Sequence, residues 1–373
     1  MQVQEIWQDD RTTWMVLDDN HTPIMPILEF LGYMDNCERS PNTVRSYAYH
    51  LRLYWEYLQI SNRLGTEVKI DDVARFIEWL RLSPEKVISL SARSGNQGVQ
   101  KAKRTETTVN AIVTAVGRFY DFQEDLGIVE NIPLYKYKRQ PKVFKDFLDH
   151  LNGGKPSKVK ELKLKEPKTI PKTLTEEEVR TLIDACHRLR DKFLIALMYE
   201  SGIRIGQALG MRHSDIKTYQ NLITVIPRDD NLNGARAKRK DPLPLDVTKD
   251  LMDLYSTYTL EEFQDCESDY IFVNLWEGKI GEPMRYGTVC ELFVRLSKKT
   301  GIKAHPHKFR HSHATNLIRS GWDAAYVQKR LGHAHVQTTI DAYVHLDDRD
   351  MKSAYQEYLS KREQHDRTQD PVD

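Results

Sequence analysis

The chain has 373 residues, a formal net charge of +1 and an ordinary hydrophobic content of 40%. This length allows two domains with separate cores, and the composition excludes a disordered or low-complexity chain. The four cysteines are scattered, so neither a disulfide framework nor a cysteine zinc cluster is expected. No signal-peptide pattern and no membrane-spanning apolar run is present, which favours a reducing cytoplasm.

The N-terminal residues 1–26 are predicted to form a β-hairpin segment. Residues 12–17 suit a strand, residues 18–21 suit a turn, and Pro23 to Met25 would begin the return strand.

Helical periodicity follows this segment. Apolar side chains recur at helical spacing in a helix that starts at Pro41 and in helices over residues 71–82 and 105–126. Proline at the first position and Gly127 after the last helix are typical start and stop signals. We therefore expect a helical domain over residues 27–135.

Positive charge is concentrated in the middle of the chain. Residues 136–172 contain twelve Lys or Arg against four Asp or Glu, whereas the residues after Leu346 contain eight acidic and five basic side chains. The central segment also has glycines, prolines and no clear periodicity, which indicates a basic linker. A charge run is often only a solvated loop, so by itself this one favours DNA binding no more than solvation.

A second domain is expected over residues 173–349. It opens with a capping box formed by Thr175 and Glu178. Helices are expected up to about Leu209 and again from residue 285, with short strands between them at 222–227, 241–245 and 270–273.

The C-terminal helix and tail, residues 350–373, carry an apolar stripe at helical spacing. The stripe consists of Met351, Ala354, Tyr355, Tyr358 and Leu359. It would pack either on its own domain or on another protomer.

Two segments of the second domain carry cationic side chains suited to binding phosphate. Arg204 follows a glycine in an apolar setting, where its guanidinium needs a phosphate or a salt-bridge partner. His307, Arg310 and His311 share one face of a helix that starts at Pro306, and a helix N-terminus attracts anions. Histidines four residues apart can also chelate a metal, but no carboxylate lies nearby in sequence, so we expect no metal site.

Two further signals are weak when taken alone. Leu331-Gly332-His333 ends a helix that runs from Asp323, and Tyr343 lies where the next helix opens. A lone tyrosine is usually part of a core, and a lone histidine usually has a backbone partner.

The order of the four signals is specific. Gly-x-Arg, His-x-x-Arg-His, Leu-Gly-His and a tyrosine ten residues later resemble the tyrosine recombinases of the phage-integrase type. The resemblance is close over residues 173–346, and residues 305–346 look most like transposases of site-specific transposons that lack terminal inverted repeats. It implies a mainly α fold with a small β-sheet, in which a helical core-binding domain and an α+β catalytic domain form a C-shaped clamp on DNA.

The resemblance also implies a role for individual side chains. Tyr343 is the implied nucleophile. Arg204 and Arg310 are implied to clamp the scissile phosphate. His307 would lie between them in the site, and His333 would hydrogen-bond the phosphate.

The general acid of the family is a lysine on a β-hairpin. Here it falls within residues 234–240, and Lys238 is preferred because it follows Gly-Ala-Arg-Ala as in related members, with Lys240 as the alternative. One position departs from the family, because Gln207 stands where an acidic residue is usual. This departure puts in doubt how firmly His307 is held.

The chemistry implied by these residues is metal-independent, cofactor-independent and ATP-independent phosphoryl transfer. A phenol with a pKa of ~10 is a weak nucleophile that needs positioning, and the transferred phosphoryl group needs alignment and charge stabilisation. The implied function is site-specific recombination or integrase-type transposition through a 3′-phosphotyrosine intermediate.

The implied partners are double-stranded DNA at element ends and target, and further protomers in a tetrameric synapse. Linker lysines would contact the DNA backbone, namely Lys155, Lys158 and Lys160. The implied location is the bacterial cytoplasm, at the nucleoid, and the sequence leaves open whether accessory recombination proteins take part.

Two alternatives share this fold. A non-catalytic DNA-binding protein would not need the full set of candidate side chains. A type IB topoisomerase would perform the same chemistry without strand exchange, but such enzymes usually lack a clear Leu-Gly-His followed by Thr-Thr and Tyr.

Overall fold

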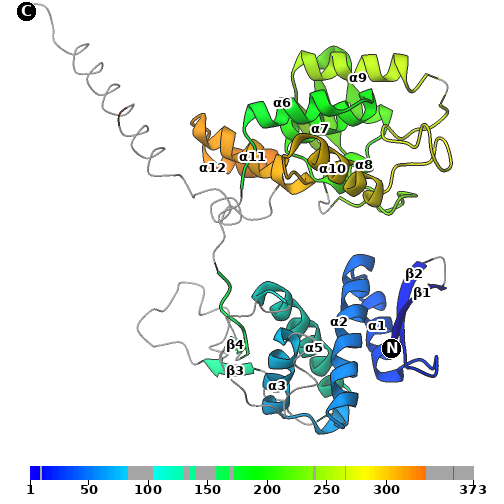
Figure 1. Ribbon diagram of the computed structural model, residues 1–373, viewed down its shortest axis with the longest axis vertical. Coiled ribbons are helices and arrows are strands. Elements are labelled where there is room, and N and C mark those ends of the chain that lie inside the picture. Colours follow the sequence, from blue (N-terminus) through cyan, green and yellow to red (C-terminus); the bar gives the residue numbers. More distant parts are fainter. Residues whose placement is uncertain are drawn as a thin grey trace, which may run out of the picture. The chain divides into compact units, whose positions relative to one another are not determined.

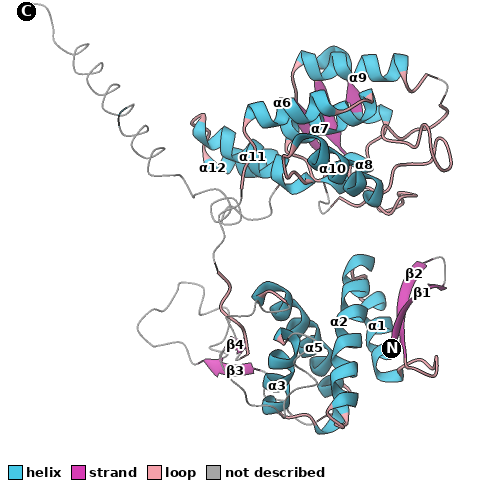
Figure 2. Ribbon diagram, in the orientation of Figure 1, coloured by secondary structure: helices cyan, strands magenta, loops and turns pink. Residues whose placement is uncertain are grey.

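The chain divides into two compact units, Met1–Lys168 and Thr169–Asp373. The computed structural model describes residues 1–8, 11–82, 104–129, 135–138, 157–160, 162–167, 172–237, 241–264, 266–332 and 356. Both units are mainly helical with small sheets (Figures 1 and 2), which confirms the predicted fold class. Among the described helices none has the length and apolar character needed to cross a membrane.

An antiparallel β-hairpin opens the N-terminal unit. β1 (Gln2–Gln8) pairs with β2 (Arg11–Leu17), which confirms the strand predicted at residues 12–17. The predicted return strand was wrong. Pro23 makes only an isolated bridge to Leu17, and Met25 already begins a helix. A proline has no N–H for a β-ladder, whereas the residues before β2 can pair along their whole length.

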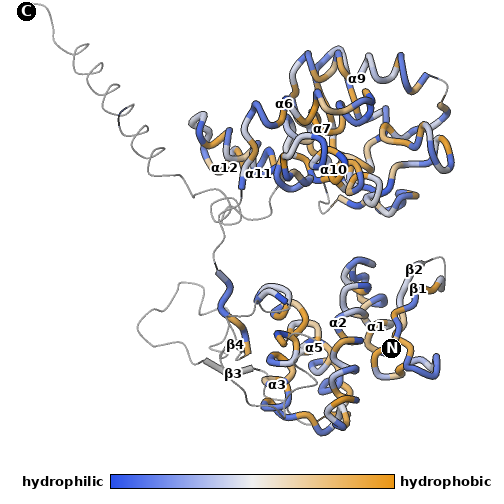
Figure 3. Tube along the Cα trace, in the orientation of Figure 1, coloured by the Kyte–Doolittle hydropathy of each residue, from blue (hydrophilic) through white to orange (hydrophobic). Residues whose placement is uncertain are grey.

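Helices complete this unit: α1 (Met25–Asn36), α2 (Pro41–Ile60), the 3₁₀ turn η1 (Gly65–Glu67), α3 (Ile70–Arg81) and α5 (Glu106–Asp125). Apolar and polar residues are interspersed along them (Figure 3), and the buried apolar residues form one core. Within that core the hydroxyl groups of Tyr54 and Tyr120 are 2.7 Å apart, so two large aromatic residues are buried with their polar atoms paired. The predicted helices and the left-handed stop at Gly127 are confirmed.

The basic segment, most of which belongs to the N-terminal unit, contains a short antiparallel pair, β3 (Tyr135–Lys138) with β4 (Ser157–Lys160). Further along, Asn110 of α5 holds the chain. Its Nδ2 donates to the Leu164 carbonyl at 2.9 Å, and its Oδ1 accepts from the Leu164 N–H at 2.8 Å. Part of the basic segment is therefore attached to the helical unit.

The C-terminal unit surrounds the buried helix α7 (Leu189–Ser201), which packs against α6, α9 and α11. The other helices and 3₁₀ turns are α6 (Glu176–Ala185), α8 (Ile205–Leu209), η2 (His213–Asp215), η3 (Thr218–Gln220), α9 (Lys249–Glu261), α10 (Tyr286–Thr300), α11 (Pro306–Arg319) and α12 (Ala324–Leu331). The antiparallel sheet has the order β5 (Ile216–Lys217), β6 (Leu222–Val225), β7 (Leu243–Asp246).

Most sequence-predicted elements of this unit are confirmed. The Thr175 hydroxyl accepts from the Glu178 N–H at 3.1 Å and the Glu178 carboxylate accepts from the Thr175 N–H at 2.9 Å, as the capping box requires. The strand expected at 270–273 is absent, because Tyr270 and Val273 make only isolated bridges.

Candidate active site

Arg310 is buried at the junction of three helices, with 4% of its surface exposed. It lies on the first turns of α11. Its Nη1 donates to the Gly202 carbonyl at 2.7 Å, just beyond the end of α7, and its Nη2 donates to the Leu331 carbonyl at 2.8 Å, at the end of α12. Carbonyl oxygens carry no net charge, so these two hydrogen bonds hold the guanidinium in place without neutralising it.

These two carbonyls lie in chain segments that precede two other predicted site residues. Gly202 stands two residues before Arg204, and Leu331 stands two residues before His333. Arg310 therefore joins the chain segments that lead into two other predicted phosphate contacts. These segments are 108 and 21 residues from Arg310 in sequence, so this convergence is a product of the fold.

Arg204 is half-buried and precedes the first turn of α8. Its backbone N–H donates to Oε1 of the buried Gln207 at 2.8 Å. The unusual glutamine thus performs the capping role that a carboxylate would also perform at this position. Since this hydrogen bond fixes the Arg204 backbone, it supports the position of the arginine.

The N-terminal turns of α11 carry two histidines beside Arg310. Pro306 is the first helical residue, as predicted, and His307 is exposed on the first turn. Burial lowers the pKa of His311, and the positive charges of His307 and Arg310 lower it further. Cationic side chains at a helix N-terminus form an environment in which an anion is stabilised.

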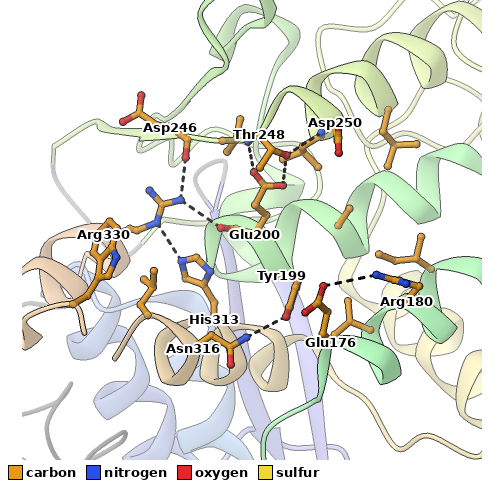
Figure 4. Close-up of a pocket in the computed structure, with 18 residues that line it drawn as sticks. Glu176, Arg180, Tyr199, Glu200, Asp246, Thr248, Asp250, His313, Asn316 and Arg330 are labelled. Atoms are coloured by element: carbon orange, nitrogen blue, oxygen red, sulfur yellow. Dashed lines mark hydrogen bonds and ion pairs between the residues drawn. The ribbon is translucent and has the colours of Figure 1, made fainter. Parts of the chain in front are cut away.

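A hydrogen-bonded pair of residues that the sequence prediction missed, the buried His313 and the half-buried Arg330, supports this arrangement (Figure 4). Arg330 Nε donates to His313 Nε2 at 3.2 Å, and Arg330 Nη2 donates to the carbonyls of Asp246 at 2.9 Å and Glu200 at 3.4 Å. The pair fixes the end of α12 to α11, α7 and β7. The second histidine of the His-Ser-His sequence was a signal for such a contact, but its partner is distant in sequence.

Gly202 allows the close packing of this region. Its φ of +65° is left-handed, and a Cβ atom there would lie 2.6 Å from His313 Cδ2 and 2.8 Å from Leu331 Cδ2. The glycine of the Gly-x-Arg signal is thus required for conformation and for space.

A pocket of about 810 Å³ lies beside the His313–Arg330 pair. It is lined mainly by residues of α6, α7, α9, α11 and α12, and Arg204 and Arg310 do not line it. Figure 4 shows Arg330 and His313 on one side and Thr248 and Asp250 on another. The pocket is consequently separate from the candidate phosphate site.

The described part of the site contains Arg204, His307 and Arg310. The other predicted side chains lie outside the described residues, namely Lys155, Lys238, Lys240, His333 and Tyr343. Lys158 and Lys160 lie in β4. Within the residues that the structure describes, no group of three or more His, Cys, Asp or Glu is arranged to hold a metal ion.

His313 is expected to make the protein less stable in acid. Burial, followed by the charge of Arg330, lowers its pKa to about 4. A histidine with a depressed folded-state pKa contributes stability that is complete above its unfolded pKa and lost as the pH falls towards the folded value. Denaturant titrations should therefore show a loss of about 3 kcal/mol from this residue between pH 6.5 and 4.

The variant His313→Gln serves as the comparison for this prediction. Other groups titrate over the same pH range, so the relevant quantity is the difference between the two stability profiles. Parallel profiles for the wild type and the variant would contradict the assignment.

An arginine pair in separate segments, joined to a histidine-bearing helix N-terminus, defines a site suited to an enzyme that acts on phosphodiesters. The comparisons with known proteins agree. Residues 172–350 match the phage integrase family and residues 27–125 match the phage integrase N-terminal SAM-like domain. The chain belongs to the phage integrase family and is a tyrosine recombinase, which confirms the resemblance seen in the sequence.

Relatives of known name cover nearly the whole chain. Transposase A from transposon Tn554 of Staphylococcus aureus is 42% identical over 367 residues, which are 97% of this chain and 99% of that protein. Tyrosine recombinase XerA of Pyrococcus furiosus is 27% identical over 328 residues, which cover 87% and 91% of the two chains. The solved Tn1549 transposon integrase in complex with a circular intermediate DNA has the same fold, with a TM-score of 0.59, 14% identity and coverage of 89% and 99%.

Proposed function

We propose that this chain is an integrase-type transposase that cuts and rejoins DNA at specific sites through a bond between Tyr343 and a 3′-phosphate. The observation that carries the proposal is the position of Arg310 between the carbonyls of Gly202 and Leu331. That position supports the convergence of Arg204 and His333 on one phosphate. The 42% identity to a transposase over nearly the whole chain supports the biological role.

In the proposed reaction, the Tyr343 hydroxyl attacks the scissile phosphorus and the bond to the 5′-oxygen breaks. Arg204 and Arg310 stabilise the charge on the non-bridging oxygens, with His307 and His333. A lysine gives a proton to the leaving 5′-oxygen. Attack by another 5′-hydroxyl reverses the step and reseals the strand, so the phosphotyrosine conserves the bond energy and neither ATP nor a metal is used.

A nicked suicide substrate that carries the element ends tests this proposal. The short fragment that carries the new 5′-hydroxyl diffuses away after cleavage. Religation is then prevented, so a covalent DNA–protein adduct accumulates. We expect the adduct to form in excess EDTA and to map to Tyr343. Loss of the adduct in chelator would support a metal-dependent site, and relaxation of supercoils without site preference would support a topoisomerase.

The proposed partner is double-stranded DNA, held by both units in a clamp in the bacterial cytoplasm, at the nucleoid. Positive charge in the segment around β3 and β4 would then lie along the phosphate backbone. Replacing Lys155, Lys158 and Lys160 by glutamine should reduce the slope of log affinity against log salt by about 2 to 3, because each phosphate contact contributes about 0.9.

Site preference provides the control for this substitution, because phosphate contacts carry no base information. It is expected to remain as in the wild type when specific and random duplexes are compared. An unchanged salt slope would place these lysines in solvent.

Strand exchange between two sites needs four active protomers, so we propose a tetramer on DNA. The apolar stripe of residues 351–359 is suited to docking on a neighbouring copy, and a cyclic exchange of such helices would close the assembly.

Deletion of the chain from Asp350 onward should spare folding and binding to a single site but impair cooperative assembly on paired sites. Light scattering of protein–DNA complexes measures the number of protomers directly. A truncated protein that assembles as well as the full chain would show that the stripe packs on its own domain.

A further inference from the structure

The first half of the connection between β6 and β7 is fixed to the helix that follows Arg204. Asn233 Nδ2 donates to the Leu209 carbonyl at 3.0 Å and to the Met284 carbonyl at 2.9 Å, and its Oδ1 accepts from the Ala235 N–H at 3.0 Å. Leu209 is the last residue of α8, and Met284 lies just before α10. The side chain of Asn233 thus fixes the connection both to the end of α8 and to the residues before α10.

Further contacts close the connection into a compact turn. The buried Asn231 donates from Nδ2 to the Ala235 carbonyl at 2.8 Å, and its own carbonyl accepts from the Gly234 N–H at 2.9 Å. Arg228 at the start of the connection donates to both carboxylate oxygens of Asp215 at 2.7 Å. A bidentate ion pair and a side-chain-bonded turn restrict the backbone on this side.

Gly206 brings the connection against α8 itself. A Cβ atom at Gly206 would lie 2.9 Å from the Arg236 carbonyl oxygen. This contact is two residues after Arg204 on one side and two residues before Lys238 on the other. Two residues span at most about 7–8 Å, so the chain at Arg236 is fixed within that reach of the Arg204 backbone, and only one residue separates it from Lys238 in sequence.

We propose that Asn233 and Gly206 are positioning residues for the general acid. They hold residues 228–237 on α8, so that the lysine that follows delivers its proton at the phosphate bound by Arg204. A lysine side chain is long and flexible, whereas proton transfer needs a separation of about 2.6–3.2 Å, so the backbone that carries it must be fixed. This inference rests on the proposed function, in which Lys238 or Lys240 protonates the leaving oxygen.

Two variants test the proposal by different routes. Asn233→Ala removes the hydrogen bonds to Leu209 and Met284. Gly206→Ala keeps every hydrogen-bonding group and pushes the Arg236 carbonyl away from α8. Gly287→Ala is the matched control, because Gly287 lies in α10 and a Cβ atom there meets nothing within 4 Å.

Single-turnover cleavage is measured on a normal suicide substrate and on one with a 5′-bridging sulfur, whose leaving group needs no proton. Both variants should cleave the normal substrate about 10- to 100-fold more slowly than the wild type. The sulfur substrate should restore most of the rate. Arg204→Lys should stay slow on both substrates, and Gly287→Ala should match the wild type on both.

Equal slowing on both substrates would overturn the positioning role, since the defect would then lie elsewhere than in proton delivery. Lys238→Ala and Lys240→Ala separate this failure from failure of the proposed function. If the sulfur substrate restores cleavage by one of the lysine variants but not by Asn233→Ala or Gly206→Ala, only the positioning role of Asn233 and Gly206 is refuted. If the sulfur substrate restores cleavage by neither lysine variant, the lysine is not the general acid, and the positioning role is refuted with it.

Discussion

Tyr343→Phe should form no covalent adduct with DNA, whereas its affinity for an intact duplex should equal that of the wild type. The substitution removes a single hydroxyl group, and that group is the proposed nucleophile. The arginines and histidines that would bind the phosphate remain in place. The measurement pairs denaturing-gel detection of the adduct with a binding titration at one fixed salt concentration.

Tyr326→Phe is the matched control for this substitution, because Tyr326 lies on α12 with 66% of its surface exposed. It should form the adduct at the wild-type rate. An adduct that persists in Tyr343→Phe would assign the nucleophile to another residue, and peptide mapping of the adduct would identify it.

The local elements of this fold could be predicted from the sequence because their signals are local. The capping box at Thr175, the proline start at Pro306 and the glycine stop at Gly127 each depend on residues within one helical turn. The return strand placed at Pro23 failed for the opposite reason. The partner of β2 is β1, which precedes it in the chain. The sequence has its clearest turn signal at residues 18–21, after β2, so the partner was expected on the wrong side.

In the candidate site, too, the residues that belong to sequence motifs could be predicted, whereas their partners from distant parts of the chain could not. Arg204, His307 and Arg310 were predicted as site residues from the order and spacing of the signals that resemble the family. The carbonyl partners of Arg310 were not predictable, because backbone atoms carry no sequence signal and Gly202 is 108 residues away. The same holds for Arg330, whose partners His313 and Asp246 lie on other elements, and for Asn233, whose bonds run to Leu209 and Met284.

The structure further explains the glutamine that departs from the family pattern. Gln207 was expected to affect how His307 is held. In the structure its side-chain oxygen accepts a hydrogen bond from the backbone N–H of Arg204, at 2.8 Å. An amide oxygen and a carboxylate oxygen are both acceptors, so this bond is kept when the charge is lost.

Arg310→Lys is expected to lose both cleavage and stability. A lysine has one nitrogen and lacks the planar fork that reaches the Gly202 and Leu331 carbonyls together. At least one buried carbonyl would be left unpaired, at a cost of about 1–3 kcal/mol. The guanidinium would also no longer contact the phosphate, and this loss should slow single-turnover cleavage by roughly 10²- to 10³-fold.

Arg204→Lys provides the comparison that separates the two effects. Arg204 is half-buried, and the hydrogen bond to Gln207 uses its backbone N–H, which lysine retains. Its cleavage should fall as far as that of Arg310→Lys, with a smaller loss of stability. Thermal unfolding without DNA measures the stability of each variant. A loss of about 2 kcal/mol should lower the Tm by roughly 4–8 °C in a unit of this size. Equal melting temperatures for the two variants would contradict the structural role of Arg310, since its two backbone carbonyls would then find other donors without cost.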